Sequence, residues 1–424
     1  MNAASRVPWL ALIRAALREP RMMFVGALGF SSGLPFGFVV FTVPVWLRTQ
    51  GVSLTEIGLL SLATLPWGFK FLWSPLVDRF RLFGSRRRGW IAATQIGIAA
   101  VLAAVASIAG APASLAVGIL VLAIAFLSAT QDIAVDAYAV ETLRPEEYGT
   151  GNGWRASTYR VAMLVSGGIA ISAAQFASWP VVFAGLAAAA VALVFAAIFA
   201  PEPIVADTSA PTFQDTVIGP FRDFLATPRA GVIAGFIFLY KLTDATAGMM
   251  FHPMLVDHGF PLVEIGLAQK TVGLVAAMIG AMAGGVYTSG KGIRAGLLVG
   301  ALTQPLSNLA YFAVAVSGQS RVVLYGAVAA ENICGGLGAA ALMAYMSSLC
   351  GTRYCATQFA LLTSLFGLSR SVAGAMGGAM AERLGYPVFF ISTVALGLPA
   401  LLLWGMLGAS ANGRATDAVV PRES

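Results

Sequence analysis

Charged side chains inside long apolar segments are the residues of this sequence best suited to chemistry. The carboxylates Asp132, Asp244 and Glu331 each lie in such a segment. A charge in the hydrocarbon region of a membrane costs a few kcal/mol, and proteins retain it for a pathway, a partner or a proton relay. Burial and a neighbouring cation both shift the pKa of a carboxyl group. We therefore predict that these three carboxylates are the candidate proton-binding groups.

Basic side chains occur in the same segments and nearly balance the acidic ones. They are Lys70, Arg155, Arg160, Lys241, Lys270 and Arg370, against Asp78, Asp132, Asp136, Glu141, Asp244 and Glu331. Lys241 and Asp244 are three residues apart and Asp132 and Asp136 four apart, so each pair shares one helix face. The balance predicts pairing within a helix bundle. Such pairs could hold helices together or could bind substrate and change partners, and the sequence leaves both interpretations open.

The composition indicates whether these charges lie in a membrane or in a water-soluble protein. Of the 424 residues, 58% are hydrophobic and 11% charged, and the mean hydropathy is +0.81. A soluble chain has about 45–50% apolar and about 25% charged residues. Uncharged runs of about 20 residues, long enough to cross a bilayer, recur along the chain. We expect an all-α integral membrane protein rather than a soluble enzyme.

Twelve apolar segments are expected to cross the membrane. They lie at 22–47, 57–78, 90–109, 115–139, 153–176, 179–199, 230–250, 262–288, 293–317, 321–347, 356–380 and 386–408. With the N-terminus inside, seventeen basic residues fall in inner connections and three, Arg48, Arg321 and Arg383, in outer ones. Lys and Arg are retained on the cytoplasmic side, so we predict that both termini are cytoplasmic. The net charge of +7 is then a topology signal, and no nucleic-acid partner is expected.

The chain divides into two similar halves. The motif GVSLTEIG at 51–58 recurs as GFPLVEIG at 259–266, and Arg160 followed after six residues by Gly-Gly recurs at Arg370. The predicted organisation is an N-terminal half at 1–200, a cytoplasmic linker at 201–229 and a C-terminal half at 230–424. An amphipathic surface helix is expected at 8–19. Two parallel six-helix repeats are the organisation of the major facilitator superfamily, whose site lies near the midplane.

The depths of the charges within these segments suggest two clusters. At a rise of about 1.5 Å per residue, Lys70, Asp132 and Arg160 lie roughly 10–12 Å from the inner boundary and could meet. Asp244, Lys270 and Glu331 lie at similar depths in the outer part. Our hypothesis is that the clusters bind substrate and exchange partners as access alternates.

Other charges lie where the predicted segments end. Asp78, Arg79 and Arg87 lie beside an arginine-rich inner connection, where gating or structural salt bridges are expected. Asp136 and Glu141 also lie close to the interface, so a loop-pairing role is open for both.

No other chemistry is indicated by the motifs. The sequence has no GxSxG elbow, P-loop or Cys/His cluster, so a hydrolase, an ATP-driven pump and a metal site are not expected. Glycine pairs four residues apart, as at Gly33/Gly37, Gly280/Gly284, Gly296/Gly300 and Gly374/Gly378, are typical of closely packed membrane helices.

Several segments together resemble the AmpG muropeptide permease family. They are LGFSSGLPFG (28–37), FKFLWSPLVDRF (69–80), FLSATQDIAVDAYAVE (126–141), YRVAMLVSGG (159–168), LYKLTDA (239–245), ENICGGLGAAA (331–341) and ATQFALLTSL (356–365). This family belongs to the branch of the major facilitator superfamily that also holds acetyl-CoA transporters.

The resemblance implies a specific activity. It implies proton-driven import of N-acetylglucosamine-1,6-anhydro-N-acetylmuramic acid, with or without peptide, across the inner membrane for peptidoglycan recycling. Where an inducible beta-lactamase exists, such transport feeds its induction and hence beta-lactam resistance. A sugar-peptide needs amides, aromatic surfaces and fixed cations. The candidate ligands are Gln131, Tyr159, Gln304, Asn308, Asn332 and Gln358, with Lys70, Arg160, Lys241 and Lys270 as cations.

Two alternatives stay open at this point. The chain could carry another anionic solute, such as an acyl-CoA or a peptide, or it could be a non-transporting membrane protein that assembles or senses. Retained charges inside the bilayer argue against the second alternative. We expect a monomer that needs no cofactor beyond the proton gradient.

Overall fold

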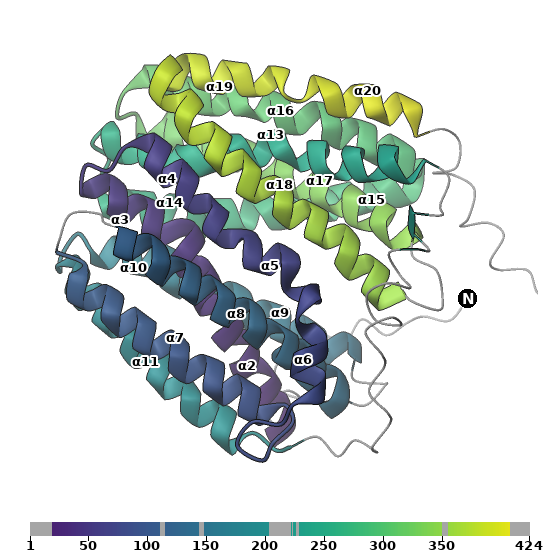
Figure 1. The fold of residues 1–424 in the computed structure, drawn as a ribbon. Coiled ribbons are helices and arrows are strands. Elements are labelled where there is room, and N and C mark those ends of the chain that lie inside the picture. The colour runs from purple at the N-terminus through teal and green to yellow at the C-terminus, as the bar shows by residue number, and fades with distance from the viewer. Residues whose placement is uncertain are drawn as a thin grey trace, which may run out of the picture. The chain divides into compact units, whose positions relative to one another are not determined.

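The computed structural model describes residues 19–110, 115–143, 148–202, 222, 224–225, 229–349 and 355–407. Within these ranges the regular structure is helical, and the helices follow the predicted segments (Figure 1). The first unbroken run is α2 (Pro20–Gly37), η1 (Phe38–Thr42) and α3 (Val43–Thr49). The predicted segment 57–78 consists of short pieces in series: α4 (Leu54–Leu60), η2 (Ser61–Thr64), α5 (Leu65–Phe69), η3 (Lys70–Leu72) and α6 (Ser74–Arg79).

The remaining helices match the other predicted segments. They are α7 (Arg88–Ile108), α8 (Leu115–Thr142), α9 (Tyr148–Met163) with η5 (Leu164–Ile169) and α10 (Ala170–Ala173), α11 (Trp179–Phe199), α13 (Ala230–Asp257), α14 (Leu262–Ala268) with η7 (Gln269–Gly273) and α15 (Leu274–Lys291), α16 (Ile293–Ser317), α17 (Arg321–Leu349), α18 (Cys355–Leu384), α19 (Tyr386–Ala395) and α20 (Leu398–Met406). Among the described residues, nine helices are long and apolar enough to cross a membrane. The prediction of a multi-pass membrane protein is confirmed.

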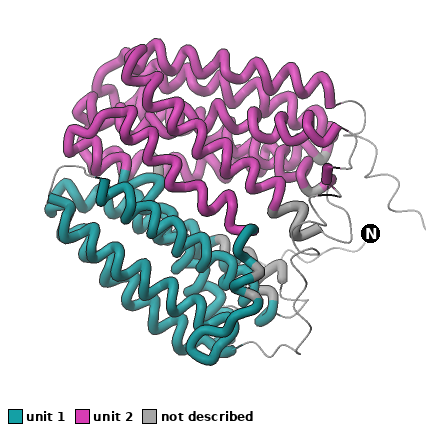
Figure 2. Tube along the Cα trace, viewed as in Figure 1, with its two compact units in different colours: residues 1–43, 72–211 teal, residues 44–71, 212–424 magenta. Residues whose placement is uncertain are grey.

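The chain forms two compact units, which are described separately (Figure 2). Unit 1 comprises residues 1–43 and 72–211, and its helix α2 packs on α9 while α7 packs on α11 and α8. One cluster of buried apolar side chains in this unit includes Leu28, Ile91 and Tyr138. Dense contact between neighbouring helices gives this unit a core of its own.

Unit 2 comprises residues 44–71 and 212–424. Helix α17 packs between α15 and α16, α13 packs on α18, and a core cluster includes Phe236, Tyr240 and Tyr345. The segment 44–71 precedes the predicted linker by more than a hundred residues, yet its helices α4 and α5 lie along α18 (Figure 1). The predicted halves 1–200 and 230–424 remain a prediction.

Small residues allow the helices of each unit to approach closely, as their spacing predicted. A methyl group added to Gly284 on α15 would lie 2.6 Å from the Leu337 carbonyl oxygen on α17. Gly33 and Gly37 on α2 likewise face the backbone of α9, and Gly378 on α18 faces the backbone of α4. Larger side chains at these positions would push the helices apart.

Tight turns follow two helices at the repeated motif. Gly51 and Gly259, the first residues of the two copies, have φ angles of 78° and 74°. This left-handed region disfavours residues that have a Cβ. Both copies therefore reverse the chain in the same way after a long helix.

Two predicted elements lie outside the described residues. The expected surface helix at 8–19 is described only at Glu19, and most of the linker at 201–229 is likewise not described.

Candidate functional site

A cluster of charged and amide side chains lies between three helices of unit 2. Lys241 on α13 is 6% exposed, and its ammonium nitrogen lies 2.8 Å from Asp244 Oδ2 and 2.7 Å from Gln304 Oε1. The i,i+3 spacing brings Lys241 and Asp244 onto one helix face, as predicted. Gln304, on α16, is itself 1% exposed and donates to the Gly300 carbonyl at 3.0 Å. The amide therefore holds the ammonium group in one position.

Glu331 on α17 adds a second carboxyl group to this cluster. It interacts electrostatically with Asp244 and with Tyr311, and it accepts from Asn332 Nδ2 at 2.9 Å. A methyl group added to Gly335 would lie 3.6 Å from Glu331 Oε1 and 4.0 Å from Asp244 Oδ1. The two carboxyl groups, predicted to lie at similar depth, thus face each other.

A second basic residue, Arg370 on α18, interacts with the same cluster. Arg370 interacts electrostatically with Asp244, and its guanidinium lies 5.4 Å from the centre of the Phe366 ring. The Lys241 ammonium lies 5.8 Å from the same ring. An aromatic face stabilises nearby cations by cation–π attraction. The cluster therefore contains two carboxyl groups and two basic groups.

This arrangement is chemically suited to carrying a proton. Ionised carboxylates are acceptors only, so two of them can hydrogen-bond to each other only through a proton. Lys241 and Arg370 can each balance one negative charge. A proton entering or leaving the pair would change the attraction between α13, α17 and α18.

The corresponding polar network of unit 1 carries no formal charge. Gln131 on α8 is fully buried, and its amide nitrogen lies 2.5 Å from Gln95 Oε1 and 3.4 Å from Ser31 Oγ. Gln95 Nε2 donates to the Ala190 carbonyl at 3.1 Å, so α2, α7, α8 and α11 are joined. The neighbouring Asp132 is partly buried.

The charges near the ends of the unit 1 helices form ion pairs. Arg155 pairs with Asp136, and Arg87, which is 4% exposed, pairs with Glu141 at 2.6 Å. Glu202 Oε1 accepts from the Arg86 and Arg87 backbone amides at 2.8 and 3.3 Å. Asp136 and Glu141, for which a loop-pairing role was left open, both lie in ion pairs, and the part played by Glu202 was not predicted.

The remaining candidate residues are more dispersed. Asn308 on α16 is fully buried and donates to Thr393 Oγ1 at 2.9 Å. Tyr159 lies 6.1 Å from Phe36, ring centre to ring centre, and Arg160 is exposed. Lys70 belongs to unit 2 and Asp132 and Arg160 to unit 1, so their meeting stays a prediction. Arg79 is exposed, and the side chains of Asp78, Lys270 and Gln358 lie outside the described part.

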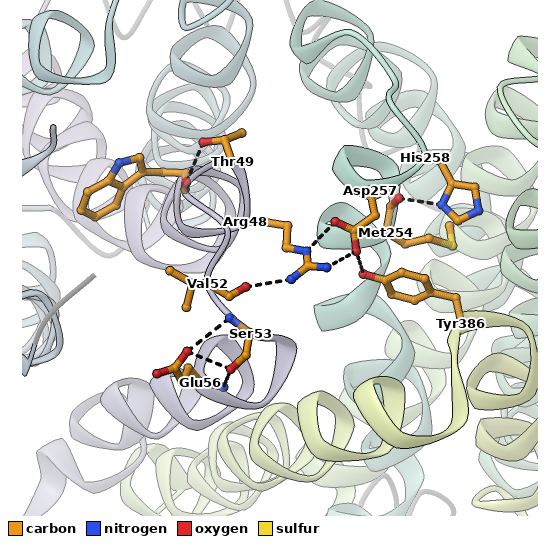
Figure 3. A network of polar contacts seen from close by, with 10 residues as sticks. Arg48, Thr49, Val52, Ser53, Glu56, Met254, Asp257, His258 and Tyr386 are labelled. Carbon is orange, nitrogen blue, oxygen red and sulfur yellow. Dashed lines mark hydrogen bonds and ion pairs between the residues drawn. The ribbon is translucent and has the colours of Figure 1, made fainter. Parts of the chain in front are cut away.

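A polar network at one end of unit 2 was not predicted (Figure 3). The Arg48 guanidinium donates to both carboxylate oxygens of Asp257, at 2.5 and 2.6 Å, and to the Val52 carbonyl at 2.8 Å. The Tyr386 hydroxyl lies 2.5 Å from Asp257 Oδ2. Arg48 was one of only three basic residues in the predicted outer connections, which is the signal that could have identified it.

Comparison with known proteins identifies the type of molecule that contains these networks. The anhydromuropeptide permease of Escherichia coli K12 is 36% identical over 389 residues, which is 91% of this chain and 79% of that protein. The AmpG 4 transporter of Rickettsia felis is 31% identical, covering 95% of this chain and 100% of that protein. The family model described as Acetyl-coenzyme A transporter 1 matches residues 22–167.

Solved structures agree on the fold. The nucleoside transporter NupG superposes with a TM-score of 0.72 at 12% identity, covering 92% of this chain and 100% of that chain. The D-xylose-proton symporter gives 0.67 at 14% identity, covering 90% and 96%. The chain thus has the major facilitator superfamily fold, and its relatives are transporters rather than enzymes. By its identity with the permeases over nearly its whole length, the chain belongs to the AmpG permease family and is a multi-pass transporter of the inner membrane.

Proposed function

We propose that this transporter imports anhydromuropeptides across the inner membrane and that the proton gradient drives the import. The carrying observation is the Lys241–Asp244–Glu331 cluster, whose lysine is 6% exposed, in a member of the AmpG family. The named permease of Escherichia coli supports the substrate class. A charged cluster inside the bilayer supports ion coupling, because a scaffold would not need to retain it.

The proposed coupling step uses the two carboxyl groups of the cluster. A proton held between Asp244 and Glu331 leaves one negative charge opposite Lys241. Release of that proton creates a second negative charge, which draws Lys241 or Arg370 closer. Asp132 remains a third candidate proton site.

Substrate contact is assigned to polar side chains that keep some exposure. Lys70, Tyr159, Arg160 and Asn332 are partly or fully exposed, so hydroxyl, amide and carboxylate groups of a sugar-peptide can reach them. Gln131 and Asn308 are fully buried, and their amides bond neighbouring helices. We therefore assign these two to helix packing in this conformation. The transporter is proposed to act as a monomer with both termini in the cytoplasm.

A second candidate substrate is an acyl-CoA. Residues 22–167 match the family model described as Acetyl-coenzyme A transporter 1. An acyl-CoA is also a large anionic amphiphile that would need fixed cations. The permease relatives, which cover far more of the chain, favour the muropeptide.

The test is uptake of labelled anhydromuropeptide into proteoliposomes that contain only this protein. Accumulation with an inward proton gradient, collapsing when the gradient is abolished, is the expected result. Uptake that ignores the gradient would remove the coupling proposal but keep the substrate. Uptake of acetyl-CoA without any uptake of muropeptide would establish the second candidate instead.

A further inference from the structure

Three basic side chains lie at one end of unit 2, where several of its helices begin or end. They are Arg229 at the N-cap of α13, Lys291 at the end of α15 and Arg294 in the first turn of α16. Helix α20 ends at the same place, because Arg229 Nη1 donates to the Met406 carbonyl at 2.9 Å. Lys291 and Arg294 are separated by a tight turn at Gly292, which has a φ of 88°. We call Arg229, Lys291 and Arg294 the basic cluster.

The two arginines of the basic cluster have neutral partners. The Arg294 guanidinium carbon lies 4.9 Å from the centre of the Trp404 ring, and the indole N–H of Trp404 donates to the Arg294 carbonyl at 3.1 Å. The partner of Arg229 is likewise a carbonyl oxygen. A ring and a carbonyl attract a cation and fix its position, but neither carries a negative charge. These contacts therefore orient the two guanidinium groups without neutralising them.

Carboxyl groups are distant from the basic cluster along the helices that form it. Among the described residues, α15, α16 and α20 contain no Asp or Glu, and the first one in α13 is Asp244. The helical rise places Asp244 about 22 Å along the axis from Arg229. At the other end of unit 2, by contrast, the exposed Arg321 is paired with Glu264. The basic cluster thus keeps a positive charge that an anion from outside the described chain can balance.

An apolar stripe on α20 leads to the basic cluster. Leu398, Leu402 and Met406 are spaced four apart, so they share one helix face, and they are 59%, 73% and 55% exposed. Helix α20 lies along α13 and α16 (Figure 1), and the stripe ends at the residue whose carbonyl binds Arg229. Trp404 lies in the last turn, a position typical of the membrane–water interface. A cationic end joined to an apolar stripe complements an anionic phospholipid, which has a charged headgroup and apolar chains.

We propose that the basic cluster binds the phosphate of one anionic phospholipid, with an acyl chain lying along Leu398, Leu402 and Met406 of α20. The forked guanidinium groups bind phosphate oxygens at two points, and the lysine adds a point charge. Basic pockets between membrane helices bind anionic headgroups in this way. The lipid would join the ends of α13, α16 and α20. The proposal depends on the chain being a multi-pass membrane protein and is independent of the transported substrate.

The first test measures lipid binding to the purified full chain in detergent by native mass spectrometry. One phosphatidylglycerol per chain is expected to bind. Phosphatidylcholine, whose headgroup has no net charge, should bind at least about fivefold more weakly. Glycerol phosphate carries the charge without the chains and should not displace the lipid at equal concentration. Equal binding of the two lipids would overturn the proposal, and displacement by glycerol phosphate would overturn the lipid as the occupant.

The second test removes the cations at positions that should not disturb folding. Arg229 has a φ of 64°, in the left-handed region that glycine prefers, so Arg229→Gly removes the charge without backbone strain. Lys291→Gln changes an exposed side chain. Each substitution should weaken phosphatidylglycerol binding about fivefold and the pair about 25-fold. The matched control, Arg383→Gln, removes an exposed arginine at the other end of unit 2 and should leave the affinity unchanged.

Thermal stability gives an independent readout of the same site. A ligand that binds the folded chain raises its melting temperature with ligand concentration. The variant Arg229→Gly/Lys291→Gln should need about 25-fold more phosphatidylglycerol than the wild type for the same rise. Wild-type affinity and stabilisation in this variant would overturn the lipid site. Neither readout uses transport, so absence of anhydromuropeptide uptake would count against the proposed substrate and leave the lipid site standing.

Discussion

The two compact units each contain a polar network between their helices, and the networks differ in charge. In unit 1, Gln131, Gln95 and Ser31 join helices through neutral hydrogen bonds, and the ion pairs lie towards helix ends. In unit 2, Lys241, Asp244 and Glu331 lie within the helices α13 and α17. The hydrogen bonds of a neutral network do not depend on protonation. The interactions within a charged network change each time a carboxyl group gains or loses a proton. We therefore propose helix packing as the role of the first network and proton coupling as the role of the second.

The largest effect is expected when the Lys241 ammonium group is removed from the charged network of unit 2. Lys241→Met leaves Asp244 and Glu331 without their nearest positive charge, and loss of one partner of a buried pair costs about 3–5 kcal/mol. We expect a large fall in thermal stability and no measurable uptake. In the double variant Lys241→Met/Asp244→Asn, stability should largely return while uptake stays absent. Stability and uptake close to wild type in the single variant would contradict the cluster's role.

The next variant is designed to separate coupling to the proton gradient from movement of the substrate across the membrane. Glu331→Gln keeps a side chain that can hydrogen-bond to Asp244 but cannot release a proton. Gradient-driven accumulation of anhydromuropeptide should be lost, while exchange of labelled for unlabelled substrate at equal concentrations continues. Asp132→Asn serves as the comparison from unit 1. If Asp132→Asn alone abolishes accumulation, the proton site lies in unit 1.

The neutral network should respond through stability rather than coupling. Gln131→Leu leaves the Gln95 amide oxygen without its donor, which costs about 1–3 kcal/mol for a buried group. The pH dependence of uptake should be unchanged. Replacing both partners, Gln95→Leu/Gln131→Leu, should recover part of the stability. Reduced uptake without a change in thermal stability would instead favour the substrate-binding role predicted for Gln131 from the sequence.

The smallest expected effect concerns a charge at the edge of unit 2. Hydrogen bonds from the Thr55 side chain and backbone hold the pKa of Glu382 below its usual value. A lowered pKa contributes stability that is complete above the unfolded pKa, about 4.3, and is lost as the pH falls through the folded value. Glu382→Gln should therefore be slightly less stable than wild type at neutral pH. The difference in melting temperature should vanish in acid, and a difference that grows in acid would contradict this assignment.

Local spacing predicted the fold and part of the site. Apolar runs located the membrane helices, and the three-residue spacing of Lys241 and Asp244 predicted their pairing. Both predictions were possible because each depends only on residues within a single helix. Depth counting brought Asp244 and Glu331 to the same level, and the structure joins them. Gln304, named from the sequence only as a substrate ligand, accepts a hydrogen bond from the Lys241 ammonium and so holds part of this cluster in place.

The partners that the sequence did not predict come from other parts of the chain. Tyr311, Gln95, Glu202 and Asp257 join the networks because of which helix faces which, and a periodic pattern fixes only the face and not the neighbour. The same limit explains the segment 44–71, whose place on α18 follows from small residues meeting across two helices. Helix packing of this kind depends on three-dimensional arrangement that no single segment encodes.

The shortness of the turns that begin with Gly51 and Gly259 also limits what a protease or an antibody could recognise there. Each left-handed glycine reverses the chain so sharply that only residues 50–53 and 258–261 separate the flanking helices. The distribution of arginines predicts that these turns face outward. A protease acting on intact cells would find little extended chain to cleave at either turn. An antibody raised against them would have an epitope of only a few residues, so a reporter tag would need to be placed on the opposite face.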